Sequence, residues 1–294
     1  MLSIIIITFN RKDELKECLA SIFNQTILPD EIIIVDNNSS DGTKDLFGPG
    51  KIDHPAIKYY RLEKNLGVAG ARNYGINKAS GDILIFIDDD ALIKSSDAFE
   101  KIILKFKNDP NLGVCAFKIV NFYTKQVIPE EFPHKDKSIM DLNEEFETSY
   151  FIGAAHAIKR EVFEKCGLYP DEYFYGMEEL DLSFRILDRG YKIVYCPDIV
   201  VLHKKSRRGR IKDKDKWIYL LRNRMCISYK YLSTKNFLIS SLIWFVKVAI
   251  KSKSFIVPIL GVKAFFQMKN AFEKKPIKKR TLGKLKKLGG RIWH

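Results

Sequence analysis

Two short runs of β-branched residues near the start of the chain, separated by a helical pattern, most constrain its fold. The runs are SIIIITF and EIIIVD, and nearly continuous β-branched sequence is typical of strands covered on both faces. Between them, Leu15, Leu19 and Ile22 recur at helical spacing, and Asn10 is the expected N-cap of this helix. Strand, helix and strand in this order predict an α/β fold with a mainly parallel sheet.

Polar residues follow each apolar strand at the point where the strand ends. They occupy positions 8–10, 36–38 and 88–90, the last being three consecutive aspartates after the run ILIFI. Ligands of open α/β sheets bind outside the carboxyl ends of the strands, so we expect the three groups to converge there. Neighbouring carboxylates raise one another's pKa, and a divalent cation would offset their repulsion; a solvated turn is the alternative explanation.

Charge is distributed unevenly along the 294 residues, whose net charge is +14. Residues 204–294 carry 26 Lys and Arg against 3 Asp and Glu, a net charge of +23, whereas the first 203 residues carry −9. The two parts are therefore expected to have different roles. Five scattered cysteines without a close pair indicate a reducing, cytosolic setting, and they argue against both disulfides and a thiolate zinc site.

The last part of the chain, residues 206–294, predicts a basic and partly amphipathic helical extension. Its apolar stretches, NFLISSLIWFVKVAI and FIVPILGVKAFF, are interrupted by lysines and are too short to span a bilayer. We expect helices that lie on an anionic membrane surface, which would place the protein in the cytoplasm, peripheral on the inner face of the cell membrane.

The alternative for this extension is nucleic-acid binding. The residues that could stack on bases beside its Lys and Arg runs are Trp217, Tyr219, Trp244 and Trp293. No nucleic-acid-binding module is visible in the sequence, and the apolar stretches fit a bilayer better. We therefore expect no nucleic-acid partner.

Several other polar residues admit both a structural and a functional explanation. Asp36 could accept hydrogen bonds from a base or a ribose, but the G-x-G-x-x-G turn of a Rossmann dehydrogenase is missing after the first strand. Arg72, in NLGVAGARNYG, could reach a phosphate or a nearby acid, and its flanking glycines could instead serve close helix packing. In GMEELD, Glu178, Glu179 and Asp181 suit the first turn of a helix, and one of them could be a general base.

Five motifs in order resemble those of family 2 glycosyltransferases with the GT-A fold, in particular the branch that contains rhamnosyltransferase-like enzymes. The motifs are SIIIITFNR, IIIVDNNSSDGT, NLGVAGARNYG, ILIFIDDDA and the stretch from FIGAAHAI to DIVVLH. The resemblance covers residues 1–205 and implies a mixed, mainly parallel central sheet flanked by helices. It implies a nucleotide-binding half, 1–110, and an acceptor and catalytic half, 111–205, followed by the extension.

The resemblance also implies the residues of a nucleotide-sugar and metal site. Those that would hold the nucleotide sugar are Thr8, Phe9, Asn10, Asp36, Arg72, Asp88 and Asp89. Arg72 would lie near the pyrophosphate. Asp88 and Asp90 would form the D-x-D pair, with Asp88 nearer the ribose, Asp90 the main ligand of Mn²⁺ or Mg²⁺, and His203 completing the metal site. Asp89 has no separate role in this scheme and would otherwise only face solvent.

The same resemblance assigns the catalytic base and the sugar pocket. Glu179 matches the base, where the family usually has the shorter Asp, and Glu178 stands beside it. Gly153, Ala154 and Ala155, within the expected strand FIGAAHAI, would line the sugar and acceptor pocket together with Glu178. Residues 121–150 are expected to shape the choice of sugar.

The implied reaction is an inverting, metal-dependent transfer of a hexosyl or deoxyhexosyl group. The sugar would pass from a nucleoside-diphosphate-sugar to a hydroxyl of a glycan or lipid-linked acceptor at the membrane surface, as in polysaccharide biosynthesis of the cell envelope. A homo-oligomer is compatible with this function. One alternative is a non-catalytic, membrane-bound partner that retains the fold, although the acids are all present. The other is a nucleotidyltransferase, although the phosphate-binding loop that it needs after the first strand is missing.

Overall fold

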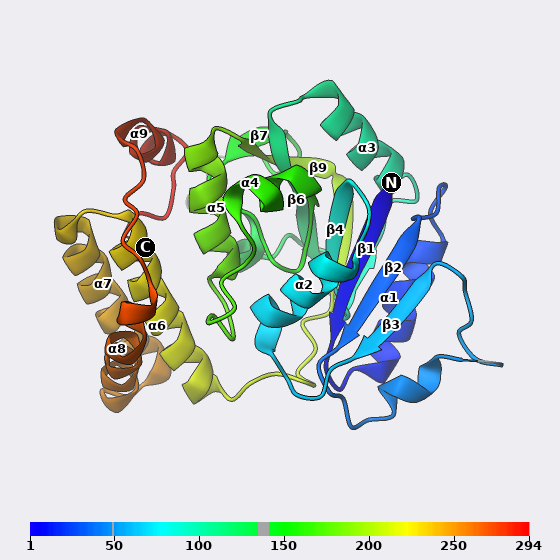
Figure 1. The fold of residues 1–294 in the computed structure, drawn as a ribbon, viewed down its shortest axis with the longest axis horizontal. Helices are drawn as coiled ribbons and strands as arrows, with labels where there is room; N and C mark the ends of the chain where they lie inside the picture. Colours follow the sequence, from blue (N-terminus) through cyan, green and yellow to red (C-terminus); the bar gives the residue numbers. More distant parts are fainter. Residues whose placement is uncertain (49, 135–140, 294) are drawn as a thin grey trace.

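The computed structural model describes residues 1–48, 50–134 and 141–293. Within these residues the centre of the fold is a sheet of nine strands in the order β3-β2-β1-β4-β8-β6-β9-β5, with β7 also paired to β9 (Figure 1). Positions 135–140, part of the 121–150 stretch expected to shape the choice of sugar, lie outside the described residues.

The N-terminal half of the sheet is parallel, as the sequence predicted. Its strands are β1 (Leu2–Thr8), β2 (Glu31–Asp36), β3 (Ile57–Arg61) and β4 (Ile83–Asp88). In the register of these strands, Thr8 lies opposite Asp36 and Ile7 lies opposite Asp88. The ends of β1, β2 and β4 therefore meet at one edge of the sheet, and the predicted convergence of their polar residues is confirmed.

The C-terminal half of the sheet is mixed and returns to the same edge. Its strands are β5 (Ala91–Ile93), β6 (Leu112–Asn121), β7 (Phe146–Thr148), β8 (Ala155–Lys159) and β9 (Lys192–His203). β8 runs antiparallel to β4 and β6, and β9 runs parallel to β6. β5 pairs antiparallel with β9 and places Ala91 opposite His203. The end of the last strand is thereby joined to the turn after β4.

Helices cover both faces of the sheet (Figure 1). They are α1 (Lys12–Phe23), α2 (Gly67–Lys78), α3 (Ala98–Asn108), α4 (Arg160–Cys166) and α5 (Glu178–Arg189). α1 and α3 share a hydrophobic cluster with Ile4 and Ile6 of β1. α2, α4 and α5 share the other cluster with Ile5 of the same strand. Successive residues of β1 thus enter opposite cores, which explains why the run is apolar throughout.

One local expectation for the first helix is wrong. Asn10 is not the N-cap, because α1 begins at Lys12 and Arg11 occupies the cap position without a side-chain cap bond. Asn10 instead has a left-handed φ of 56°, which asparagine tolerates better than most residues. Its Oδ1 accepts a hydrogen bond from the backbone N–H of Ser40 at 2.7 Å, so it joins the ends of β1 and β2.

The described part of the extension forms four further helices, of which α6 and α9 contact α5, while α7 and α8 pack on α6 (Figure 1). They are α6 (Asp213–Tyr231), α7 (Thr234–Ser252), α8 (Ile256–Met268) and α9 (Lys279–Lys287). Lys230 and Tyr231 of α6 donate to Asp181 of α5 at 2.5 and 3.0 Å. Leu221 and Cys226 of α6 belong to the same hydrophobic cluster as α5. Among the described helices, none combines the length and apolar character that crossing a bilayer requires.

A buried glutamate, Glu31, joins three parallel strands at the amino edge of the sheet. Its Oε1 accepts from the hydroxyl of Ser3 at 2.6 Å and from the backbone N–H of Ser80 at 2.5 Å, and its Oε2 accepts from Lys58 at 2.6 Å. Burial raises the pKa of Glu31, but Lys58, Ser3 and Ser80 outweigh it and lower the pKa from 4.5 to about 2.

We predict that Glu31→Gln lowers the free energy of unfolding at neutral pH by about 1.5 to 3 kcal/mol, because an amide nitrogen cannot accept these hydrogen bonds. The folded pKa is below the unfolded one, so this contribution is complete above pH 4.5 and is lost as the pH falls toward about 2. Urea unfolding of both proteins across this range measures the effect. Glu63→Gln, at an exposed position, serves as the control. A difference in unfolding free energy between wild type and Glu31→Gln that does not become smaller at low pH would contradict the prediction.

Candidate functional site

A cavity of about 410 Å³ opens at the edge of the sheet where the strand ends meet. This volume is within the range of small-molecule sites. Its acidic wall consists of the three aspartates that follow β4, with His203 at the end of β9. Another part of its wall is basic and includes Lys205 and Arg210, from the segment between β9 and α6, and Lys216, from the first turn of α6.

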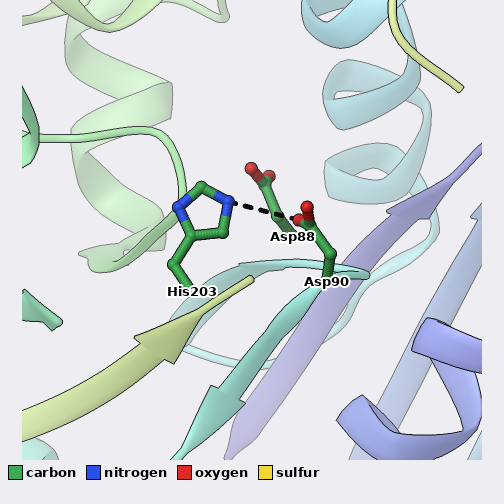
Figure 2. Close-up of side chains that lie close together, drawn as sticks. All are labelled: Asp88, Asp90 and His203. Carbon is green, nitrogen blue, oxygen red and sulfur yellow. Dashed lines mark ion pairs between the residues drawn. The ribbon is translucent and has the colours of Figure 1, made fainter. Parts of the chain in front are cut away.

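Asp88, Asp90 and His203 form a cluster inside this cavity. Each offers a ligand atom, and these atoms all lie within 4.8 Å of one another. Figure 2 shows the imidazole ring of His203 facing both carboxylates, with Nε2 of His203 3.3 Å from Oδ1 of Asp90. The β5–β9 pairing brings the cluster together, because it sets Ala91 beside His203.

Glu131 fixes the orientation of His203 from the other side of the ring. Oε2 of Glu131, in the short 3₁₀ turn Pro129–Glu131, lies 2.8 Å from Nδ1 of His203, so Nε2 is directed at Asp90. Burial lowers the pKa of His203, but Asp90 and Glu131 outweigh it and raise the pKa to about 10. Glu131 is a site residue that the sequence motifs did not indicate.

Asp90 has the properties of a cation ligand. Its side chain is 1% exposed, its Oδ2 accepts from the backbone N–H of Ser206 at 2.7 Å, and its buried Oδ1 lies 3.3 Å from both His203 and Arg11, without a hydrogen bond of good geometry to either. Burial raises the pKa of Asp90, whereas His203 and Arg11 lower it to about 2, so the carboxylate is charged. Two carboxylates and one imidazole are a donor set that fits Mn²⁺ or Mg²⁺.

Asp89 is buried, so the expectation that it only faces solvent is wrong. It is 2% exposed, and Arg11 donates to its Oδ1 at 2.7 Å. The same guanidinium lies 3.3 Å from Asp90, and its Nε donates to the carbonyl oxygen of Arg208 at 2.7 Å. Burial raises the pKa of Asp89 to about 7 although Arg11 lowers it. Arg11, which sequence reasoning missed, binds two of the three aspartates.

Arg72 contacts the acids at the start of α5. The nearby acid that the sequence offered as one partner is present, and contact of Arg72 with a pyrophosphate stays a prediction. Its Nη1 lies 2.6 Å from Glu179 and 3.4 Å from Glu178, and its Nη2 lies 3.6 Å from Asp88. Burial and the charge of Glu179 raise the pKa of Glu178 well above its usual value. Burial thus favours the uncharged form of Glu178 next to an arginine that also contacts Glu179.

Gly153 lies in a turn before β8, because β8 begins at Ala155 and the expected strand FIGAAHAI is shorter than predicted. Nη2 of Arg72 donates to the Gly153 carbonyl oxygen at 2.9 Å. A Cβ atom at position 153 would lie 2.0 Å from Oε1 of Glu179, so any other residue there would displace the Glu179 carboxylate from its place beside Arg72. Gly153 and Ala154 line the cavity, whereas Ala155 is fully buried in the sheet.

The residues expected to hold the nucleotide lie at different depths. Phe9 lines the cavity, whereas Thr8 and Asp36 are buried next to it. Both oxygens of Asp36 are already engaged, by the backbone N–H of Ser39 at 2.7 Å and by the hydroxyl of Tyr59 at 2.5 Å. Asn10 holds the neighbouring loop. Direct contact of Asp36 or Asn10 with a nucleotide stays a prediction.

The segment that follows β9 covers the site. The backbone N–H of Lys204 donates to the carbonyl oxygen of Asp90 at 3.0 Å. Gly209 has a φ of 65°, and a Cβ atom there would lie 2.1 Å from the carbonyl oxygen of Phe9. Lys205 and also Arg210, which belongs to the extension expected to bind a membrane, therefore form part of the wall of the cavity. Their sequence alone carries no signal for this contact.

A sheet of this order, with acidic residues and a histidine at its carboxyl edge, defines the GT-A fold of nucleotide-sugar transferases. A crystal structure of GalNAc-T7 with UDP, GalNAc and Mn²⁺ shares this fold with a TM-score of 0.67 at 20% identity, over 83% of this chain and 50% of that one. The model of glycosyl transferase family 2 matches residues 3–167, and the chain belongs to this family.

Two relatives are similar in sequence. The O-antigen chain rhamnosyltransferase RfbN of Salmonella typhimurium is 27% identical over 218 residues, which are 71% of this chain and 68% of RfbN. A GalNAc(5)-diNAcBac-PP-undecaprenol β-1,3-glucosyltransferase of Campylobacter jejuni is 43% identical over 91 residues, which are 30% of this chain and 29% of that enzyme. The expected family and fold are confirmed.

We predict that Gly153→Ala lowers the rate of sugar transfer by about 100-fold, because the added methyl group displaces the Glu179 carboxylate and separates it from Arg72. The rate is measured as nucleoside diphosphate released in the presence of acceptor, and thermal unfolding shows whether the variant is folded. Gly283→Ala, in α9 with open space around the glycine, is the matched control. Wild-type turnover by a folded Gly153→Ala protein would refute the crowding argument.

Proposed function

We propose that this chain is an inverting, metal-dependent glycosyltransferase. It transfers a hexosyl or deoxyhexosyl group from a nucleoside-diphosphate-sugar to a hydroxyl of a glycan or lipid-linked acceptor at the membrane surface. The observation that carries the proposal is the meeting of Asp88, Asp90 and His203 in one cavity, with the Glu178–Glu179 pair held next to it by Arg72.

The cavity is suited to a nucleotide sugar because it has an acidic side and a basic side. Asp88, Asp90 and His203 would hold Mn²⁺ or Mg²⁺, and the bound cation supplies positive charge that offsets the charge of the leaving nucleoside diphosphate. Lys205 and Arg210, on the basic part of the wall, would bind the diphosphate oxygens directly. Together these residues orient the donor with its anomeric carbon toward Gly153.

Glu179 is the better candidate for the catalytic base. Its side chain is 15% exposed, whereas that of Glu178 is 3% exposed and cannot reach an acceptor without moving. Glu179 removes the proton of the acceptor hydroxyl while that oxygen attacks the anomeric carbon. The bond from this carbon to the diphosphate oxygen breaks on the opposite face, so the configuration at the carbon is inverted. The proton remains on Glu179.

The membrane assignment is supported by the outer surface of α7 and α8. We define the apolar surface as the large exposed hydrophobic residues of this helix pair, namely Leu238, Leu242, Val246, Ile250, Phe255, Ile256, Ile259 and Phe266. The chain carries no Asp or Glu between Lys216 and Phe272, so every charged side chain of the pair is a cation. Exposed apolar residues among cations match an anionic bilayer.

Two observations support a lipid surface and lipid-linked acceptor over a nucleic acid. Trp244, one of the aromatic residues that could stack on bases, is 4% exposed and packs in the core. The Campylobacter jejuni relative is named for an undecaprenol-linked acceptor. A bilayer would also cover the apolar surface, which a nucleic acid would leave in water. A peripheral location on the cytoplasmic face of the membrane follows from the proposal.

We predict that Glu179→Gln lowers the rate of transfer by about 100-fold or more, because an amide cannot take up the acceptor proton. Binding of the donor is expected to survive, since the proposed role of Glu179 is on the acceptor hydroxyl and the proposed donor contacts are Asp88, Asp90, His203, Lys205 and Arg210. A thermal-shift screen across UDP-, GDP- and dTDP-sugars first identifies the donor, and the same assay then reports its binding to the variant. The control is Glu164→Gln on the exposed side of α4, and an active Glu179→Gln enzyme would exclude this base.

We also predict that exhaustive chelation abolishes transfer and that added Mn²⁺ or Mg²⁺ restores it. Asp88→Asn should weaken Mn²⁺ binding at least about tenfold, because the amide brings no charge to the cluster. Mn²⁺ titration followed by thermal unfolding measures this affinity without any need for turnover. The exposed Asp53→Asn is the control. Undiminished activity after chelation would count against the metal.

A further inference from the structure

A second cavity lies between the first turn of α6 and the turn that joins α7 to α8. Its volume is about 440 Å³. Lys214 and Trp217 line it from α6, and Lys251, Lys253 and Ser254 line it from the α7–α8 turn. Within the described residues, no carboxylate forms an ion pair with any of these three lysines. Three cations thus surround a hollow with no counter-ion paired to them.

The charge of this cavity selects an anion. Asp213 also lines it and brings one negative charge, so three lysines and one aspartate leave an excess of positive charge. Ser254 adds a hydroxyl, which accepts a hydrogen bond from the backbone N–H of Ile256 at 3.2 Å and can donate its own proton to a ligand. Lysine ammonium groups and a serine hydroxyl are groups that bind phosphate oxygens.

The position of this cavity selects an anion attached to a hydrocarbon chain. Ile256 lines the cavity and is also part of the apolar surface, being 65% exposed. The neighbouring Phe255 is 82% exposed. A ligand that extends from the lysines toward these side chains meets polar groups first and apolar groups next. A lipid phosphate has a polar group followed by a hydrocarbon chain, whereas free phosphate has only the polar group.

The two cavities of the protein are neighbours through the first turn of α6. Lys216 lines the cavity that holds the aspartates, while Lys214 and Trp217 line the second one. Residues two positions apart project from different faces of a helix, so the two cavities lie on either side of α6, which with its side chains is about 10–12 Å across. A phosphate bound by the lysines would therefore keep a sugar attached to it close to the catalytic cavity.

We propose that the second cavity binds the phosphate of the lipid that carries the acceptor hydroxyl. The proposal rests on the proposed glycosyltransferase function at a membrane and names where its acceptor is held. Lys214, Lys251 and Lys253 bind the phosphate oxygens, the apolar surface receives the hydrocarbon chain, and the sugar points past Lys216. The three lysines of this site contribute to binding of the acceptor and not to binding of the donor.

The test compares two variants that remove the same charge. The site variant is Lys214→Gln, Lys251→Gln and Lys253→Gln combined, and the control variant is Lys279→Gln, Lys286→Gln and Lys287→Gln combined, in α9. All six lysines are exposed, so both proteins are expected to fold, which thermal unfolding checks. Binding is measured by sedimentation with neutral phosphatidylcholine vesicles that contain either polyprenyl phosphate or an equal charge of phosphatidylglycerol.

We predict that the site variant binds polyprenyl phosphate vesicles about tenfold or more weakly than the control variant does. On phosphatidylglycerol vesicles the two variants should lose similar amounts of binding, because the attraction to that lipid depends on the number of lysines and not on their place. Equal losses of binding by the two variants on polyprenyl phosphate vesicles would overturn the proposed site. The site variant could instead lose binding selectively on phosphatidylglycerol vesicles, by as much as on polyprenyl phosphate vesicles. That result would also overturn the proposal, because it would indicate a headgroup site unrelated to the acceptor.

Failure of this site can be told apart from failure of the proposed function. Donor hydrolysis without acceptor should be unchanged in the site variant, because its three lysines lie outside the catalytic cavity. A wild-type protein that binds no anionic vesicle would refute the membrane part of the proposed function. A wild-type protein that binds, with a site variant that binds equally well, refutes only the phosphate site.

Discussion

The site depends on the neutralisation of three adjacent aspartates by three cations from different parts of the chain. Arg72 of α2 lies 3.6 Å from Asp88, Arg11 before α1 lies 2.7 Å from Asp89, and His203 at the end of β9 lies 3.3 Å from Asp90. Two of the three carboxylates are buried, which without these partners would cost several kcal/mol per charge. Three features of the fold bring these groups together. They are the order of the strands, the position of Arg11 before α1, and the end of β9 at His203.

A second shared charge connects the Asp88–Asp90–His203 cluster to the proposed base. Arg72 contacts Asp88, Glu178 and Glu179 at once, and Gly153 leaves the space in which the Glu179 carboxylate lies. A change at any of these positions alters the electrostatic field at the others. The acids on either side of Arg72 therefore behave as one unit, although they come from β4 and α5.

The features that the sequence predicted are those that depend on local periodicity and strand direction. The apolar runs placed Thr8, Asp36 and Asp88 at one edge, because the ends of parallel strands coincide. The partners of these residues could not be predicted in the same way. Arg11 precedes a helix and Glu131 lies in a short turn, and neither pattern says which distant group it will meet. The burial of Asp89 could not be predicted for the same reason, because its partner is Arg11.

The place of β9 in the sheet has a consequence for folding. His203 ends a strand that lies between β6 and β5, and β6 and β5 both precede it in the chain by many residues. The cluster is therefore complete only after the last strand has been inserted, and a chain that is still being synthesised offers aspartates without their histidine. Non-local pairing of this kind forms late and slowly. A cation that needs all three side chains would therefore bind only after the sheet is complete.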